Sequence, residues 1–342
     1  MSLPAGAVKR VTERAAFRRP LQIIVFLFGL SGIGARAQEL LRLEASLDAM
    51  GTTFTVALYG EERDRLENAA DAAFAEVRRL ERMLSNYRPS SEWSRVNREA
   101  ADHPVRVSRE LFELLSACQD YSRASEGAFD ITVGPLMKVW GFYRGTGRLP
   151  AREEIAAAAA KVGYGKLVLD AENQTVRFTE PGVEIDPGGI GKGYAVDRVV
   201  AILRDNGIRA ALVSASGSSI YGLGAPPGEP QGWEVRIRHP KDETQTVETL
   251  RLRDQSLSTS GSYEKFFVAE GKTYSHIMDP RTGYPAAGML SVSVLAARTL
   301  DSEAWTKPFF ILGRQWAARH RPKDLRVFLC EDTAELQCAW LP

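Results

Sequence analysis

The sequence lacks an excess of charge of either sign. Its 342 residues include 44 lysines and arginines and 43 aspartates and glutamates, which leaves a formal net charge of +1 at pH 7. Proteins that bind nucleic acid usually carry a surplus of basic residues, gathered into a patch or along one helix. We therefore expect no nucleic acid among the partners of this protein.

The motifs of several common catalytic sites are also missing. The four histidines and three cysteines form no cluster with the spacing of a zinc site. The G-x-S-x-G motif of the α/β-hydrolases is absent. The glycine-rich segment around Lys192 is not a P-loop, because the next residue is Gly193 instead of serine or threonine. These absences argue against a zinc enzyme, an α/β-hydrolase and a P-loop nucleotidase.

The most apolar run of the chain lies within the first 37 residues. Four arginines between positions 10 and 19 precede the apolar run 21–30, and small residues follow as far as Ala35-Arg-Ala37. This order is typical of a secretory signal, and the run is short for a membrane span. We predict a signal peptide over residues 1–37 and a mature exported, periplasmic protein over residues 38–342. An uncleaved anchor, which would associate the domain with the membrane surface, remains the alternative.

An exported location affects the interpretation of the cysteines. Cys330 and Cys338 lie in two short strand patterns separated by a turn, and an oxidising compartment permits a disulfide between them. Because the sequence does not define their geometry, both the paired and the unpaired state stay open. Cys118 lies on the apolar face of a helical pattern, and we expect it in the core.

The strongest chemical signal lies between residues 182 and 205. An apolar strand pattern over 182–186 precedes four glycines between positions 188 and 193, and a helical pattern follows from Tyr194 to Arg204. A strand, a glycine-rich turn and a helix can direct backbone N–H groups and the positive end of the helix dipole at an anion, usually a phosphate. Lys192 adds a full positive charge. The alternative is a structural turn with a solvated lysine.

Hydrophobic periodicity predicts alternating helices and strands elsewhere. Helices are expected over residues 61–84, 108–125, 150–163 and 302–312, strands over 43–58, 210–220 and 291–297, a hairpin over 166–179, and polar loops over 256–264 and 274–285. We therefore predict an α/β protein of α+β character, with mixed sheets, flanking helices and a central cleft in a single unit.

Several polar residues are candidates for ligand contacts, and each has a structural alternative. Tyr87 lies in a polar loop, either as a stacking platform for a planar ring or as a cover for the core. Asp130 and Thr132 stand beside a Gly-Pro turn, as part of a ligand wall or as turn residues. His276 is bracketed by Ser275 and an Asp-Pro turn. Together with the glycine-rich turn, these groups suit pyrophosphate chemistry with a hard cation such as Mg²⁺.

Seven sequence blocks, taken together, resemble the ApbE-type flavin transferases, the FAD:protein FMN transferases. The blocks occur in the order of that family: Met50-Gly-Thr52, Ser85-Asn-Tyr-Arg-Pro89, Phe129-Asp-Ile-Thr-Val-Gly-Pro135, Asp186 to Asp197, Thr259-Ser-Gly261, His276 to Gly283 and Phe310-Ile-Leu-Gly313. They span nearly the whole predicted mature chain.

The resemblance implies an activity and a set of site residues. The enzyme would cleave the pyrophosphate of FAD, join FMN through its phosphate to a threonine or serine hydroxyl of a partner flavoprotein, and release AMP. His276 would accept the proton of that hydroxyl, and Lys192 would stabilise charge on the leaving AMP. The FAD-binding residues would be Met50, Tyr87, Phe129, Asp130, Asp186, Lys192 and Ile277.

The resemblance also implies a Mg²⁺ site, and there the sequence departs from the family. The carbonyl of Gly189 would be one ligand, whereas Glu303 and Lys307 occupy the positions of a family aspartate and threonine. Glutamate can supply an oxygen, but a protonated lysine cannot ligate a metal. Either Thr306 supplies the missing hydroxyl, or Lys307 replaces the charge of the metal.

A second departure lies after the strand at 210–220, where Gly217-Ser-Ser219 replaces the Gly-Gly-Asp of the family. These departures keep two alternatives to the transferase open. One is a periplasmic FAD-binding protein with little catalysis, and the other is a FAD pyrophosphatase that uses water as acceptor and releases FMN and AMP.

Overall fold

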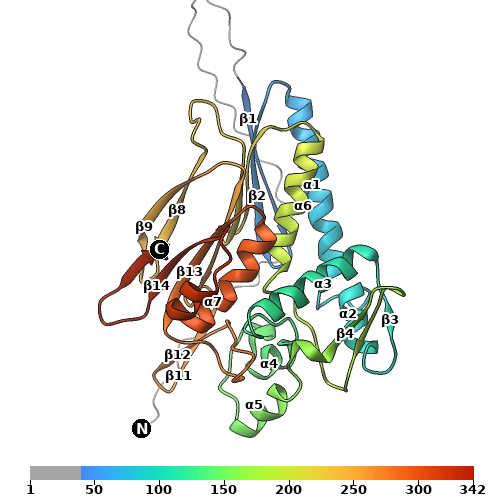
Figure 1. Ribbon diagram of the computed structural model, residues 1–342. Coiled ribbons are helices and arrows are strands. Elements are labelled where there is room, and N and C mark those ends of the chain that lie inside the picture. Colours follow the sequence, from blue (N-terminus) through green and yellow to red (C-terminus); the bar gives the residue numbers. More distant parts are fainter. Residues whose placement is uncertain (1–39) are drawn as a thin grey trace, which may run out of the picture.

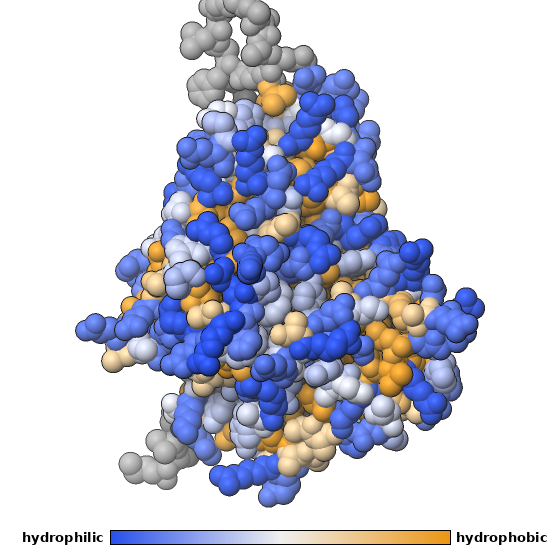
Figure 2. Space-filling view, viewed as in Figure 1, coloured by the Kyte–Doolittle hydropathy of each residue, from blue (hydrophilic) through white to orange (hydrophobic). Residues whose placement is uncertain are grey.

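The computed structural model describes residues 40–342, so the predicted signal peptide and its cleavage site lie outside the described residues. None of the helices in residues 40–342 combines the length and the apolar character needed to cross a membrane. Figure 2 shows hydrophilic residues over most of one face, with hydrophobic residues in smaller areas between them.

An eight-stranded sheet forms the centre of the fold (Figure 1). Its strands, in spatial order, are β1 (Leu41–Ala49), β2 (Thr52–Gly60), β6 (Ala210–Ala215), β7 (Ser219–Leu223), β10 (Gln255–Gly261), β13 (Met289–Ala296), β14 (Arg326–Glu331) and β15 (Gln337–Trp340). Every ladder in this sheet is antiparallel. Within residues 40–342, parallel pairing is limited to an isolated bridge between Val133 and Glu184.

Two layers cover the opposite faces of this sheet. The helices α1 (Arg63–Leu84), α6 (Gly191–Asp205) and α7 (Thr299–His320) pack on one face, and a ribbon of β8 (Trp233–His239) and β9 (Asp242–Leu252) packs on the other. Side chains alternate between the faces of a strand. On β14, Val327 and Leu329 accordingly join the cluster under α7, whereas Phe328 and Cys330 join the cluster under the ribbon.

Smaller elements enclose one end of the sheet. They are α2 (Glu92–Glu99), β3 (Val105–Arg106), α3 (Arg109–Ala124), α4 (Gly134–Val139), α5 (Arg152–Ala159), β4 (Leu167–Asp170), β5 (Thr175–Phe178), β11 (Phe266–Ala269), β12 (Lys272–Ser275) and the 3₁₀ turns Phe142–Arg144 and Tyr164–Lys166. The α/β prediction with flanking helices is confirmed. The ladders between the named strands are antiparallel instead of mixed, which gives the fold its α+β character.

The elements with strong local signals are confirmed. The helices predicted over 61–84, 108–125 and 150–163 are α1, α3 and α5, and the predicted hairpin is β4–β5. Ser108 caps α3, because its Oγ accepts a hydrogen bond from the Leu111 N–H at 3.3 Å. This contact satisfies one of the unpaired N–H groups of the first helical turn.

Two predicted elements are wrong, each for a specific reason. The single strand over 43–58 is a hairpin, because Met50 and Gly51 have φ angles of 53° and 69° and form a two-residue turn between β1 and β2. The loop over 256–264 is largely strand β10. Its hydroxyls are paired inside the fold, with 2.7 Å between the Oγ atoms of Ser258 and Ser302.

The segment around the glycine-rich turn also differs from the prediction. The stretch 182–186 forms only the bridge at Glu184 instead of a strand, and α6 begins at Gly191, three residues before the predicted start. The short helix α2 was not predicted.

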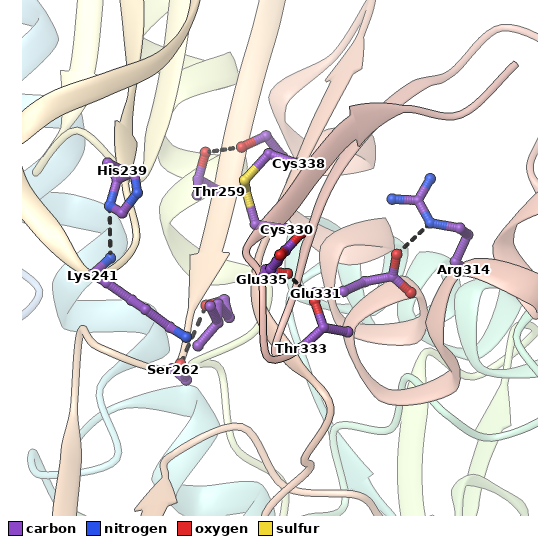
Figure 3. Close-up of a disulfide and its surroundings, with 12 residues drawn as sticks. His239, Lys241, Thr259, Ser262, Arg314, Cys330, Glu331, Thr333, Glu335 and Cys338 are labelled. Atoms are coloured by element: carbon purple, nitrogen blue, oxygen red, sulfur yellow. Dashed lines mark hydrogen bonds and ion pairs between the residues drawn. A yellow bond between two sulfur atoms is a disulfide. The ribbon is translucent and has the colours of Figure 1, made fainter.

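Cys330 and Cys338 form a disulfide that joins β14 to β15 (Figure 3). The two residues stand directly opposite each other in the ladder, with their Cα atoms 4.1 Å apart. The salt bridge between Arg314 and Glu331 lies next to it. Cys118 is fully buried in α3, as expected of a core residue, and burial raises the pKa of its thiol.

Candidate active site

A cavity of about 420 Å³ lies where the glycine-rich turn, β10 and α7 meet. Residues from segments far apart in the chain form its wall. Most of the predicted site residues line it, namely Met50, Tyr87, Asp186, Lys192, His276, Glu303, Thr306 and Lys307.

The glycine-rich turn does not present a row of free backbone N–H groups. The N–H of Gly188 donates to Asp186 Oδ1 at 2.8 Å, and the N–H of Gly191 donates to the Pro187 carbonyl at 2.8 Å. The N–H of Gly193 donates to Glu303 Oε2. The predicted use of these amides for an anion is therefore wrong for most of them, and the turn instead holds α6 against α7.

Gly193 shows why this turn requires glycine. A Cβ atom at this position would lie 2.5 Å from the Thr299 carbonyl oxygen and 2.9 Å from Glu303 Cβ. Replacing Gly193 with alanine should therefore lower the free energy of unfolding by about 1–3 kcal/mol, the usual cost of overpacking. An ordinary helical glycine would instead gain up to about 1 kcal/mol from the same change.

Urea denaturation of Gly193→Ala and Gly191→Ala provides a matched comparison. At Gly191 the nearest atom to a Cβ would be the flexible end of Met50, at 3.4 Å, and the next would be Pro187 Cβ at an ordinary contact distance of 3.7 Å. Equal stability of the two variants would contradict the packing role of Gly193.

Asp186 is a buried acceptor at one end of the cavity. Its Oδ2 accepts hydrogen bonds from Tyr143 Oη at 2.7 Å and from Asn86 Nδ2 at 2.9 Å. Burial raises the pKa of Asp186, and the hydrogen bonds from Tyr143 and Gly188 act in the opposite direction. Tyr143 was missed in the sequence, since a tyrosine in a short glycine-flanked segment carries no signal of its own.

Tyr87 and Tyr143 form an aromatic pair at the mouth of the cavity. Their ring centroids are 6.2 Å apart in an edge-to-face arrangement. Tyr87 is 72% exposed, so it does not cover the core. Of the two interpretations from the sequence, the structure favours the stacking platform, because an exposed ring offers a face to a planar ligand.

Three lysines bring positive charge to the cavity. Lys192, Lys265 and Lys307 all line it. Burial, together with the charge of Lys192, lowers the pKa of Lys265, and burial lowers the pKa of Lys307 to about 8 against the opposing effect of Glu303. Lys265 was also missed in the sequence, because it precedes an exposed hairpin. Four carboxylates also line the cavity, those of Glu81, Asp186, Glu264 and Glu303. An anion such as a diphosphate would therefore bind at the three ammonium groups and not along the whole wall.

His276 stands beside these lysines in a defined orientation. Its Nδ1 lies 3.1 Å from the Lys265 carbonyl oxygen. Burial and the charges of Lys265 and Lys192 lower the pKa of His276 to about 3, so the ring is neutral at pH 7. A carbonyl oxygen can only accept, so Nδ1 carries the proton and Nε2 keeps a lone pair. This tautomer can accept a proton at Nε2.

Most polar groups of the segment predicted to bind Mg²⁺ already form hydrogen bonds within the protein. Glu303 is 2% exposed, and its Oε1 has no hydrogen-bond partner among the described residues. The Lys192 ammonium lies 4.0 Å from this oxygen. Thr306 Oγ1 donates to the Glu303 carbonyl at 2.7 Å and lies 2.8 Å from Ser260 Oγ. Lys307 Nζ donates to the same carbonyl at 2.9 Å.

This donor set does not fit Mg²⁺, which binds through one or two available carboxylates together with waters and substrate phosphates. Of the side-chain oxygens of Glu303 and Thr306, only Glu303 Oε1 is unbonded, and the Lys192 ammonium lies 4.0 Å from it. The Lys307 ammonium is bound to the backbone carbonyl of the same glutamate. In the part of the chain that the structure describes, no group of three or more histidines, cysteines, aspartates and glutamates is placed to hold a metal ion.

The other predicted site residues lie behind the cavity wall. Phe129 is 2% exposed and packs edge-to-face on Tyr121, and Ile277 is 4% exposed in the cluster under α7.

Asp130 Oδ1 accepts hydrogen bonds from the N–H and hydroxyl of Thr132, each at 2.7 Å, and burial raises the pKa of Asp130 to about 6. These bonds favour the turn interpretation for Asp130. A Cβ atom at Gly189 would lie 3.5 Å from Lys307 Cε and 3.6 Å from Phe129 Cε2, so the glycine faces both side chains.

The serine loop between β6 and β7, which departs from the family sequence, forms another part of the cavity wall. Ser216, Ser218 and Ser219 line the cavity, and the buried Oγ of Ser219 has no hydrogen-bond partner among the described residues. Positive φ angles at Ser216 and Gly217, 56° and 72°, fold this loop tightly. Its hydroxyl groups can contact a polar ligand.

Comparisons with known proteins agree on one family. Residues 50–329 match the model of the ApbE family. A FAD:protein FMN transferase of Klebsiella pneumoniae is 34% identical over 268 residues, 77% of this chain and 80% of that protein. One of Salmonella typhimurium is 32% identical over 300 residues, 85% of each chain.

Two solved structures share the fold. The ApbE protein of Thermotoga maritima aligns with a TM-score of 0.79 and 29% identity over 86% of this chain and 96% of that one. The flavin transferase ApbE from Vibrio cholerae aligns with a TM-score of 0.78 and 25% identity over 88% and 97%. The sequence matches and the shared fold together establish that this chain belongs to the ApbE family.

Proposed function

We propose that this protein transfers FMN from FAD to a threonine or serine hydroxyl of a partner flavoprotein and releases AMP. The observation that carries the proposal is the arrangement of three lysines around a neutral His276 whose Nε2 keeps a lone pair. The name FAD:protein FMN transferase, which the curated relatives carry, agrees with it.

The cavity has a suitable group for each part of FAD. The lysines meet the diphosphate, because an ammonium binds phosphate oxygens as a point charge. Tyr87 and the side chain of Met50 offer apolar surface to a planar ring. Asp186 offers a carboxylate to a ring N–H or a ribose hydroxyl.

The transfer step follows from these positions. The acceptor oxygen attacks the phosphorus of the FMN half of FAD, and its proton passes to Nε2 of His276. The bond from that phosphorus to the bridging oxygen breaks, and its electron pair leaves with AMP, which gains one negative charge. The lysines stabilise this charge as it develops, which is the largest effect available to such a site.

The exported location remains part of the proposal. The support for it is the pattern of residues 1–37, which predicts a signal peptide cleaved after Ala37. An acceptor flavoprotein would then be exposed on the same side of the membrane.

Mass spectrometry of a reconstituted reaction tests the proposal. The purified protein is incubated with FAD and an acceptor domain that the Klebsiella pneumoniae relative modifies in parallel, with a Thr→Val acceptor as control. We expect FMN on the threonine-bearing acceptor only, with one AMP released per adduct.

The same reaction distinguishes the alternatives. AMP and free FMN without adduct would indicate a FAD pyrophosphatase. Bound FAD with neither AMP nor adduct, while the relative modifies the same acceptor, would indicate a binding protein.

A further inference from the structure

We infer that the Lys307 ammonium takes the place of a divalent cation in this cavity, so that the transfer needs no bound metal. The inference rests on the proposed function. It concerns how this chain supplies positive charge to the diphosphate, and it follows from the contacts of Lys307, the use of the neighbouring oxygens and the charges around them.

Lys307 is held in position from two sides. Its Nζ donates to the carbonyl of Glu303, one helical turn earlier in α7, at 2.9 Å. Its Cε lies 3.5 Å from the position that a Cβ of Gly189 would occupy. The side chain therefore fills the space between α7 and the glycine-rich turn, where a cation held by both segments would lie.

The oxygens around Lys307 are largely engaged with the protein itself. Glu303 Oε2 accepts a hydrogen bond from the Gly193 N–H. The backbone carbonyl of Glu303 accepts one from the Lys307 ammonium. Thr306 Oγ1 gives its proton to the same carbonyl, so Ser260 Oγ donates to Thr306 at 2.8 Å. Binding a metal here would break several of these contacts.

The charges favour the same conclusion. Lys192 Nζ lies 4.0 Å from Glu303 Oε1, and Lys307 Nζ lies 2.9 Å from the backbone carbonyl oxygen of the same residue. Two ammonium groups carry the formal charge of one divalent cation. They also repel a further cation, because like charges in a partly buried cavity are poorly screened. Lys192 and Lys307 can therefore stabilise the negative charge that passes to AMP when the bridging P–O bond breaks.

Manganese binding, measured by electron paramagnetic resonance, tests the inference independently of activity. We expect no saturable Mn²⁺ binding to the unmodified protein. In Lys307→Thr the ammonium is removed and a hydroxyl is placed beside Glu303, so we expect one Mn²⁺ to bind. Lys307→Met also removes the charge but supplies no oxygen, so it should bind none. Stoichiometric Mn²⁺ binding to the unmodified protein would overturn the inference.

FMN transfer in the presence of EDTA is the second measurement. The unmodified protein should keep its rate, Lys307→Met should lose about 10²–10³-fold, and Lys307→Thr should regain activity only with added Mg²⁺ or Mn²⁺. Loss of transfer by the unmodified protein in EDTA would contradict the inference and leave the proposed function intact. Failure to form adduct with or without metal would contradict the proposed function, while the Mn²⁺ titration would still decide the metal question.

Discussion

Replacing His276 with alanine should slow FMN transfer by about 10²–10⁴-fold while FAD still binds, the range expected when a general base is removed. The structure gives His276 two properties of a general base, a defined ring orientation and a neutral ring. Its Nδ1 faces the Lys265 carbonyl at 3.1 Å, and its pKa of about 3 leaves the ring neutral at pH 7. Alanine removes the lone pair at Nε2, whereas the lysines that meet the diphosphate remain.

Single-turnover transfer and FAD fluorescence separate these two effects. Transfer measures the base, and quenching of flavin fluorescence measures binding. His103→Ala is the matched control, because His103 is exposed in the segment between α2 and β3 and does not line the cavity. An unchanged transfer rate in His276→Ala would remove the assigned role, and a loss of FAD binding alone would make His276 a binding residue.

The pH dependence gives a further signature of the same group. Because the neutral ring is the active form, the transfer rate should fall as pH drops through the pKa of His276. Bound diphosphate adds negative charge beside the ring, so the acid limb of kcat should lie at higher pH than the acid limb of kcat/KM. Lys265→Met removes the neighbouring charge with the largest effect on this pKa and should move both limbs to higher pH.

Elements that depend on local patterns were predictable from the sequence. The apolar face of α1 recurs at helical spacing, and Ser108 marks the start of α3, so both helices follow from neighbouring residues. The hydroxyl-rich strand β10 does not, since its Ser258 is satisfied by Ser302, which lies 44 residues away in the chain. The turn at Met50 is also hard to predict, because a methionine seldom adopts a positive φ angle.

The candidate site also contains residues that the sequence identifies and residues that only the fold reveals. Residues within recognisable blocks, such as Asp186 and His276, were identified, and the cavity brings them together. Tyr143 and Lys265 belong to no such block and reach the cavity only through the packing of the 3₁₀ turn and the β11–β12 hairpin. Lys307 lies between these two cases: the sequence shows it as a departure from the family, but only the fold shows its hydrogen bond to the Glu303 carbonyl and its position beside Gly189.

Replacing Lys192 with methionine should reduce kcat/KM for transfer by about 10²–10³-fold, the effect of removing one donor that stabilises a developing negative charge. Lys192 lines the cavity, and its ammonium lies 4.0 Å from Glu303 Oε1, which has no hydrogen-bond partner in the described part of the chain. The variant therefore removes a charge from the diphosphate and, at the same time, the cation nearest to this buried oxygen.

Two comparisons separate these consequences. Lys192→Arg keeps the charge and should retain more transfer than Lys192→Met, whereas Lys323→Met removes an exposed lysine outside the cavity and should leave the rate unchanged. Urea denaturation reports the effect on Glu303, because a buried carboxylate that loses its neighbouring cation destabilises the fold. If Lys192→Met is less stable but transfers FMN at the normal rate, Lys192 serves the packing of α6 against α7, and the charge on AMP is met by Lys265 and Lys307. A loss of transfer with unchanged stability would place the Lys192 ammonium on the diphosphate instead of on Glu303.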